Sequence, residues 1–231
     1  SVWELRYTGG GNTVPAVTLG VDRAQGKPPL AVTARAEQLI DPDDLVHVYK
    51  WDFGDGATQQ TDGPAVSHTY AKDGTYTLAL QVVDGRGGAS TPVQQRITVY
   101  SGEFPTIGLE NLTTPGGERF RAGDAIRYTA ERSTGTTRLR AQDPYVWSVE
   151  LHHNDHVHPY ESGIPAATGV YTVPLDDHGE TTIFYRFGLS MFTAAGQEIN
   201  VYRDLAPDVI DLTLRTDPPA VATVTMDNGP V

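Results

Sequence analysis

Short runs of alternating apolar and polar residues recur along the chain, separated by clusters of Gly, Pro, Asn and Asp. A period of two places apolar side chains on one face of an extended strand, and the β-branched and aromatic residues in these runs favour strands. Clear examples lie at 31–35, 76–83, 96–100, 145–151 and 183–189. None of the runs sustains a helical period. The pattern therefore predicts an all-β protein built from β-sandwich modules.

Two breaks rich in Gly, Pro and Asp divide this series of strands, one at 101–105 and one at 204–208. Such clusters end strands and mark loops or linkers. We therefore predict four parts: a leader strand at 1–14, a sandwich at 15–100, a second sandwich at 101–206, and at 207–231 a C-terminal hairpin or the start of a further module.

The charge of the chain narrows the classes of partner. Lys and Arg number 17 against 29 Asp and Glu, which gives a net charge of −12, and there is no Cys. A nucleic-acid interface needs a basic stripe, so we predict no nucleic-acid partner. The acidic excess favours hard cations such as Ca²⁺ over anions. No apolar run approaches the roughly 20 residues of a membrane span, so we predict no membrane partner.

A specific series of motifs lies within the first predicted sandwich. It consists of Trp-Asp-Phe-Gly-Asp-Gly at 51–56, His-Thr-Tyr at 68–70 and Asp-Gly-Thr-Tyr at 73–76. Trp51 and Phe53 share one strand face, and Trp51 is the natural centre of a core. Gly54 and Gly56 suit a tight turn with positive φ. Structural roles therefore explain the residues of the series.

The same series resembles the PKD (polycystic kidney disease) domain, which is an immunoglobulin-like β-sandwich. The resemblance covers about 15–100. With the strands that follow, it leads us to expect two tandem immunoglobulin-like β-sandwiches and then the C-terminal β-hairpin.

Four carboxylates of this module are candidate calcium ligands: Asp41, Asp43, Asp44 and Asp84. The first three share one loop, and Asp84 closes a strand that a standard sandwich places nearby. Oxygen ligands at alternate loop positions suit Ca²⁺, and some PKD domains are similar to calcium-binding modules at this edge. The loop is equally an ordinary solvated turn, and Asp44 departs from the family's usual Gly. Both interpretations stay open.

Four of the seven histidines lie in one tract at 152–158, directly after the strand at 145–151. Alternation points His153 inward and His152 outward, and the residues that follow favour a turn. The candidate ligands of a Zn, Cu, Ni or Fe ion are His153, His156, His158 and Asp155, with His178 as a further one. A hydrogen-bonded structural network and a loop that contacts a ligand remain the alternatives.

The order of the parts resembles bacterial secreted glucose/sorbosone dehydrogenases, which are similar to PQQ-dependent sugar dehydrogenases. The segment 3–7 looks like the last strand of their propeller, and the tracts at 120–128 and 147–159 are similar to tracts of the module that follows their PKD domain. The propeller that would carry the quinone, its calcium and the catalytic histidine is missing from these residues. The resemblance therefore implies that this chain does not oxidise sugars itself.

Catalytic motifs are missing from the sequence as well. It has no Cys nucleophile, no Gly-x-Ser-x-Gly elbow, no His-Glu-x-x-His and no phosphate-binding glycine loop. We therefore expect no catalytic residues and a chain that is not an enzyme. The enzymatic alternative is a metal at the histidine tract that activates water or oxygen.

We expect bacterial accessory modules that are secreted or lie on the cell surface. They either bind a partner or act as a spacer, and the partner is a polysaccharide or a neighbouring catalytic domain. Sugar binding needs exposed aromatic rings, and the candidates are Tyr145, Tyr160, Tyr171, Tyr185 and Tyr202. Tyr160 is the first choice because it follows the histidine tract and Pro159, and Trp147 is the second ligand-binding candidate. A purely structural spacer is the alternative. No feature selects a symmetric partner, so we expect a monomer.

Overall fold

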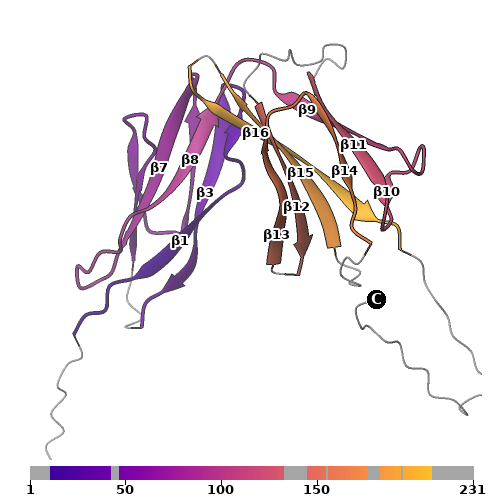
Figure 1. Ribbon diagram of the computed structural model, residues 1–231. Coiled ribbons are helices and arrows are strands. Elements are labelled where there is room, and N and C mark those ends of the chain that lie inside the picture. Colours follow the sequence, from indigo (N-terminus) through magenta and orange to yellow (C-terminus); the bar gives the residue numbers. More distant parts are fainter. Residues whose placement is uncertain are drawn as a thin grey trace, which may run out of the picture. The chain divides into compact units, whose positions relative to one another are not determined.

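The computed structural model describes residues 11–42, 47–132, 145–154, 156–175, 183–193 and 195–209 (Figure 1). The chain divides into two compact units, Ser1–Gly102 and Glu103–Val231. Every regular element within the described ranges is a β-strand, which confirms the prediction of an all-β protein. Those ranges include no helix that could cross a membrane.

The first unit consists of two sheets. One has three strands in the order β1-β3-β6, with bounds Ala16–Val21, Leu30–Ile40 and Ala65–Tyr70. The other has the order β2-β8-β7-β4-β5, with bounds Gln25–Gly26, Val93–Val99, Gly74–Val83, Val48–Asp52 and Thr58–Thr61. The described pairs are antiparallel except for the short parallel pair of β2 with β8.

The core of the first unit forms where alternate residues of both sheets turn inward. Trp51 on β4 is 1% exposed, and Leu80 and Ile97 on the neighbouring strands β7 and β8 are fully buried. The three-stranded sheet contributes Val32, Ala34 and Val66 to the same cluster. Trp51 is thus a core residue, as the sequence predicts.

The second unit repeats the arrangement of a three-stranded and a five-stranded sheet. The smaller sheet has the order β14-β11-β9, with bounds Thr168–Thr172, Ala125–Arg132 and Pro105–Asn111. The larger has the order β10-β16-β15-β12-β13, with bounds Arg119–Phe120, Glu198–Pro207, Ile183–Phe192, Tyr145–His153 and His156–Ile164. Its core includes Trp147, Val149, Leu151, Tyr185 and Phe187, all fully buried.

The two predicted end segments have different outcomes. The C-terminal hairpin, with strands expected at 209–214 and 220–226, lies outside the described residues except for its first position. Of the predicted leader strand, only 11–14 are described, and these four residues form no strand; β1 begins at Ala16.

Candidate functional site

The motif series of the first unit forms one packed network. Gly54 and Gly56 have φ values of 75° and 95°, which confirms the predicted turn. Between them, Asp55 lies 2.8 Å from the Nε2 atom of His68, whose ring stacks on Phe53 with centroids 4.0 Å apart. The network holds the turn against β6, so these residues have structural roles.

Two of the carboxylates predicted to bind calcium, Asp41 and Asp84, lie at one end of the first unit. Val48 on β4 pairs with Val83 on β7, so the residues beside this pair, His47 and Asp84, lie at the same end of the sheet. Asp41 accepts a hydrogen bond from His47 Nε2 at 2.7 Å, and its side chain is almost fully buried.

Asp84 is buried and already has three hydrogen-bond donors. Its Oδ1 atom accepts the backbone N–H groups of Arg86 and Gly88, both at 2.8 Å, and its Oδ2 atom accepts the amide of Asn12 at 2.8 Å. These bonds hold the turn between β7 and β8. Asp43 and Asp44 lie outside the described residues. A calcium ion would have to replace these donors, and calcium binding stays a prediction.

Acid should weaken the first unit through Asp84. Burial raises the pKa of this carboxyl, but hydrogen bonds from Asn12 and from the backbone of Gly88 and Arg86 lower it by more, so the pKa lies below its ordinary value of 3.8. A pKa that is lower in the folded state stabilises the fold above the unfolded pKa, and this contribution is lost as the pH falls through the folded pKa. We expect Asp84→Asn to lower the thermal midpoint at neutral pH and to flatten its decline between about pH 5 and pH 2.

Circular dichroism melts of the two proteins across this pH range test the expectation. Asp62→Asn, at an exposed position of the same unit, is the matched control and should follow the unsubstituted chain. Parallel declines for the unsubstituted chain and Asp84→Asn would contradict the role assigned to Asp84.

The histidine tract forms the tip of the β12–β13 hairpin. His153 pairs with His156 across the turn, and Leu151 pairs with His158. The Nε2 atoms of His153 and His158 are 2.7 Å apart. The ring of His153 stacks on that of His158 with centroids 4.8 Å apart, and on that of His156 with centroids 5.7 Å apart.

The outward member of the tract is separate from these three rings. His152 stacks on Phe184 of β15 with centroids 4.8 Å apart, and its Nε2 atom lies 3.1 Å from Glu150. The structure thus confirms that His152 and His153 point to opposite faces. Asp155 and His178 lie outside the described residues. Among the described side chains, no three His, Asp or Glu residues already form a metal cage.

The structure corrects one ligand-binding candidate. Trp147 is 0% exposed, its ring packs on Tyr128 with centroids 4.7 Å apart, and its indole N–H donates to the carbonyl of Ala166 at 2.7 Å. Its place on the inner face of β12, where Val149 and Leu151 are also buried, puts it out of reach of a ligand.

The tyrosine candidates differ in how much ring they present. Tyr171 and Tyr185 belong to the core, and the side chain of Tyr145 lies outside the described set. Tyr160, the first choice from sequence, is 41% exposed and leans on the rings of Tyr171 and Tyr185, with centroids 6.0 and 5.9 Å away. Tyr202 is 60% exposed, the most of these tyrosines whose exposure is described.

Tyr202 lies on the solvent side of the five-stranded sheet of the second unit. It pairs with Gly188 on β15, and a Cβ atom on that glycine would lie 3.3 Å from the tyrosine ring. The ring therefore covers a residue without a side chain, and Tyr202 stays 60% exposed. Arg186 lies over the same ring, with its guanidinium carbon 5.5 Å from the ring centroid, and forms a double hydrogen bond with Asp204 at 2.8 and 2.9 Å.

We call this surface the Tyr202 face. Alternation along β12, β15 and β16 places six outward side chains on it: Glu150, His152, Phe184, Arg186, Tyr202 and Asp204. The hydrogen bonds to Asp204 raise the pKa of Arg186, so the guanidinium stays charged. The face combines an exposed aromatic ring with paired charges. From the sequence, Tyr202 is only one of five candidate tyrosines.

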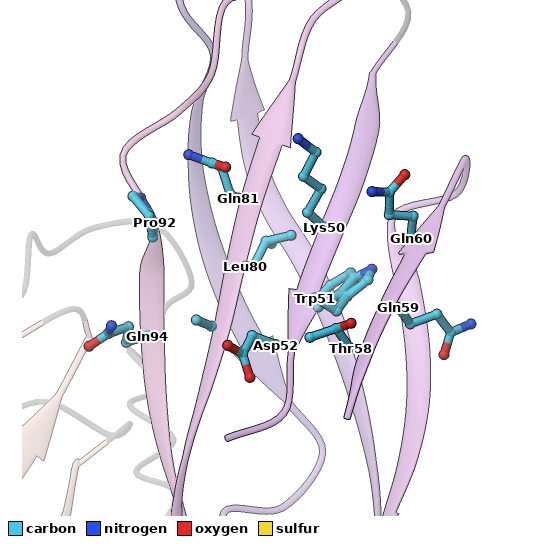
Figure 2. Close-up of a pocket in the computed structure, with 11 residues that line it drawn as sticks. Lys50, Trp51, Asp52, Thr58, Gln59, Gln60, Leu80, Gln81, Pro92 and Gln94 are labelled. Carbon is cyan, nitrogen blue, oxygen red and sulfur yellow. The ribbon is translucent and has the colours of Figure 1, made fainter. Parts of the chain in front are cut away.

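A hollow of about 560 Å³ lies on the outer side of the five-stranded sheet of the first unit (Figure 2). The amide side chains of Gln60, Gln81 and Gln94 surround it, together with Lys50 and Asp52 (Figure 2). Trp51 is the one aromatic residue in its lining, and it is turned into the core. The hollow offers hydrogen bonds but no exposed ring.

Comparison with known proteins identifies the first unit. Residues 12–99 match the PKD domain family, so this part of the chain is a PKD domain, as the sequence predicts. The microbial collagenase of Vibrio alginolyticus is 29% identical over 126 residues, which cover 54% of this chain and 15% of that protein. Human polycystin-1 is 36% identical over 132 residues, which cover 54% of this chain and 3% of that protein.

Solved structures of PKD domains also match this part of the chain. The PKD1 domain of the Vibrio cholerae metalloprotease PrtV is 30% identical, with a TM-score of 0.32, and the match covers 38% of this chain and 98% of that domain. The chain spans at most 15% of the length of the two curated relatives described above. The resemblance of the second unit to a module of sugar dehydrogenases stays a prediction.

Proposed function

We propose that the chain is a non-catalytic accessory segment, a PKD domain followed by a second β-sandwich, which binds polysaccharide through the Tyr202 face. The observation that carries this proposal is the exposed ring of Tyr202, which is 60% exposed and lies over Gly188 on a sheet surface with Arg186 against it. A ring held in this way is a flat apolar platform, and the apolar face of a pyranose ring can stack on it.

The polar groups beside the platform suit the rim of a sugar. Arg186 offers N–H donors, and Asp204 offers acceptor oxygens on the same patch. A donor and an acceptor held side by side can bind two neighbouring hydroxyl groups, each of which both donates and accepts. Ser148 and Asn200 extend the polar surface along β12 and β16.

A polysaccharide panel tests this proposal. Retention of the chain in affinity gels that contain soluble polysaccharides should fall about tenfold or more in Tyr202→Ala, because the stacking platform is lost. Tyr160→Ala is the matched control, since Tyr160 belongs to the same sheet but leans on Tyr171 and Tyr185. We expect it to bind as the unsubstituted chain does.

Other outcomes separate the remaining interpretations. If Tyr160→Ala loses binding and Tyr202→Ala keeps it, the sugar site is the one chosen from sequence and not the Tyr202 face. Because one relative is named a collagenase, the panel includes fibrillar collagen. Binding to collagen alone would contradict the proposal that the ligand is a polysaccharide. Binding to no ligand would favour the alternative of a purely structural spacer.

The setting of the chain belongs to the same proposal. The relatives include a microbial collagenase, and collagen lies outside cells, so we place this chain outside the cell or on its surface as a monomer. The matches cover at most 15% of the two relatives, which are much longer proteins, and we propose that this chain also has a neighbouring catalytic domain. The resemblance of the second unit to the sugar dehydrogenase module makes a sugar-oxidising propeller our choice for that neighbour.

A further inference from the structure

We propose that the tip of the β12–β13 hairpin binds one divalent transition-metal ion of the Zn²⁺ or Cu²⁺ class. His153 and His158 are the two primary ligands, and His156 is the third. The site goes beyond the proposed function, because polysaccharide binding at the Tyr202 face does not need it.

The register of the hairpin places the three imidazoles on one face of the sheet. His153 lies directly opposite His156, and directly opposite residues of an antiparallel pair share a face. His158 follows His156 by two positions, so it shares that face as well. Leu151 marks this as the inner face, because it is buried. The hairpin tip therefore continues the core face, but it carries imidazoles instead of apolar side chains.

The separation of the ring nitrogens suits a metal. At 2.7 Å, the Nε2 atoms of His153 and His158 share one proton, since one ring donates N–H and the other offers its lone pair. A tetrahedral ion with Zn–N bonds of about 2.0–2.1 Å holds two ligand nitrogens about 3.3 Å apart. The two rings would have to separate by about 0.6 Å for the ion to replace the shared proton.

The third imidazole is within reach of the same point. The ring of His156 lies 5.7 Å from that of His153 and is inclined to it by 22°, and His156 is exposed, so an ion can reach it from solvent. Three histidines around one ion leave a fourth position for water, as in open zinc sites. Imidazole ligands select late transition metals over Ca²⁺ and Mg²⁺, which prefer oxygen.

The same tract provides its own control. His152 is a chain neighbour of His153, yet it faces the other side of the sheet, where it stacks on Phe184 and contacts Glu150. If the site is specific, the loss of zinc affinity depends on which face of the sheet the replaced histidine occupies. Adventitious binding to an imidazole-rich segment depends only on the number of histidines. His152→Ala and His158→Ala change that number equally.

The test is isothermal titration of the tag-free, metal-stripped full chain with ZnCl₂, in the presence of millimolar Ca²⁺ and Mg²⁺. Elemental analysis after dialysis against zinc gives the stoichiometry. We expect one zinc per chain with a Kd in the micromolar range or tighter, and a loss of about tenfold or more in each of His153→Ala and His158→Ala. His156→Ala should lose less, and His152→Ala should bind as the unsubstituted chain does.

Folding of each variant is checked by far-ultraviolet circular dichroism, and His158→Gln, at an exposed position, serves as a second variant if His153→Ala unfolds. Two results would overturn the proposal. The first is the absence of zinc binding by the unsubstituted chain; a lower thermal midpoint of the His153→Ala, His158→Ala double variant would then make the pair a structural network. The second is an equal loss of zinc binding in His152→Ala and His158→Ala.

Discussion

Replacing Trp147 by alanine should strongly destabilise the second unit and leave the stability of the first unit unchanged. The side chain is 0% exposed, and its removal leaves a cavity beside Tyr128 and an unpaired carbonyl at Ala166. Truncation of a buried tryptophan costs about 3–5 kcal/mol, a large part of the roughly 5–15 kcal/mol that holds a typical domain together. The first unit has its own core around Trp51, so it should keep its stability.

Urea unfolding followed by two probes tests this expectation. Tryptophan fluorescence of the variant reports only the first unit, because Trp3 and Trp51 both precede the boundary at Gly102. Its transition should match that of the unsubstituted first unit, while circular dichroism should show a separate transition of the second unit at a much lower urea concentration. Trp147→Phe is the control, since it fills most of the volume and should keep the second unit folded. A fully cooperative loss of both units in Trp147→Ala would show that they do not fold independently.

Replacing Gly54 by alanine should destabilise the first unit far more than the same change at Gly56. Both glycines have positive φ values, 75° and 95°, so each alanine suffers a left-handed strain of about 1–2 kcal/mol. At Gly54, the new Cβ atom would also lie 2.5 Å from the carbonyl oxygen of Thr77 and 2.7 Å from its nitrogen. At Gly56, nothing lies within 4 Å of it.

The clash at Gly54 is with the backbone of β7, which cannot move without disturbing its pairing with β4. Overpacking of this kind adds about 1–3 kcal/mol, so we expect about 2–5 kcal/mol for Gly54→Ala and about 1–2 kcal/mol for Gly56→Ala. Thermal melts of the two variants give the comparison, since 1 kcal/mol moves the midpoint of a domain of this size by about 4–8 °C. Equal midpoints for the two variants would contradict the close approach of Gly54 to Thr77.

Several strands of this protein follow from its sequence alone, because their signals are local. The break predicted at 204–208 is wrong, since β16 continues to Pro207 through its pairing with β15 and β10. The alternation at 145–151 predicts a strand with Trp147, Val149 and Leu151 on its buried face, and the structure shows β12 with all three fully buried. The two glycines at 54 and 56 predict a turn with positive φ, and the turn is there. Alternation with a period of two and the steric freedom of glycine act over a few residues, so no distant contact is needed to read them.

The candidate sugar site could not be chosen from the sequence. Tyr160 and Tyr202 are both candidates from the sequence, and the position of Tyr160 beside Pro159 and the histidine tract favours it. The outcome depends instead on the partner strands: Tyr160 leans on Tyr171 and Tyr185, whereas Tyr202 meets Gly188, which has no side chain to cover its ring. The exposure of an aromatic ring on a sheet depends on the side chains of its cross-strand neighbours, and these neighbours are distant from the tyrosine in the sequence.

The histidine tract could be predicted from the sequence only in part. The sequence by itself determined that His152 and His153 point to opposite faces, because the parity of a strand is local. Whether His158 meets His153 was decided only by the register of β12 with β13, where the turn after His153 sets the pairing and two irregularities adjust it further along. A slip of one residue in that register would move His158 to the other face. The tertiary structure therefore decided the convergence of the imidazoles, because pairing between strands, and not the residues themselves, brings their nitrogens to within 2.7 Å.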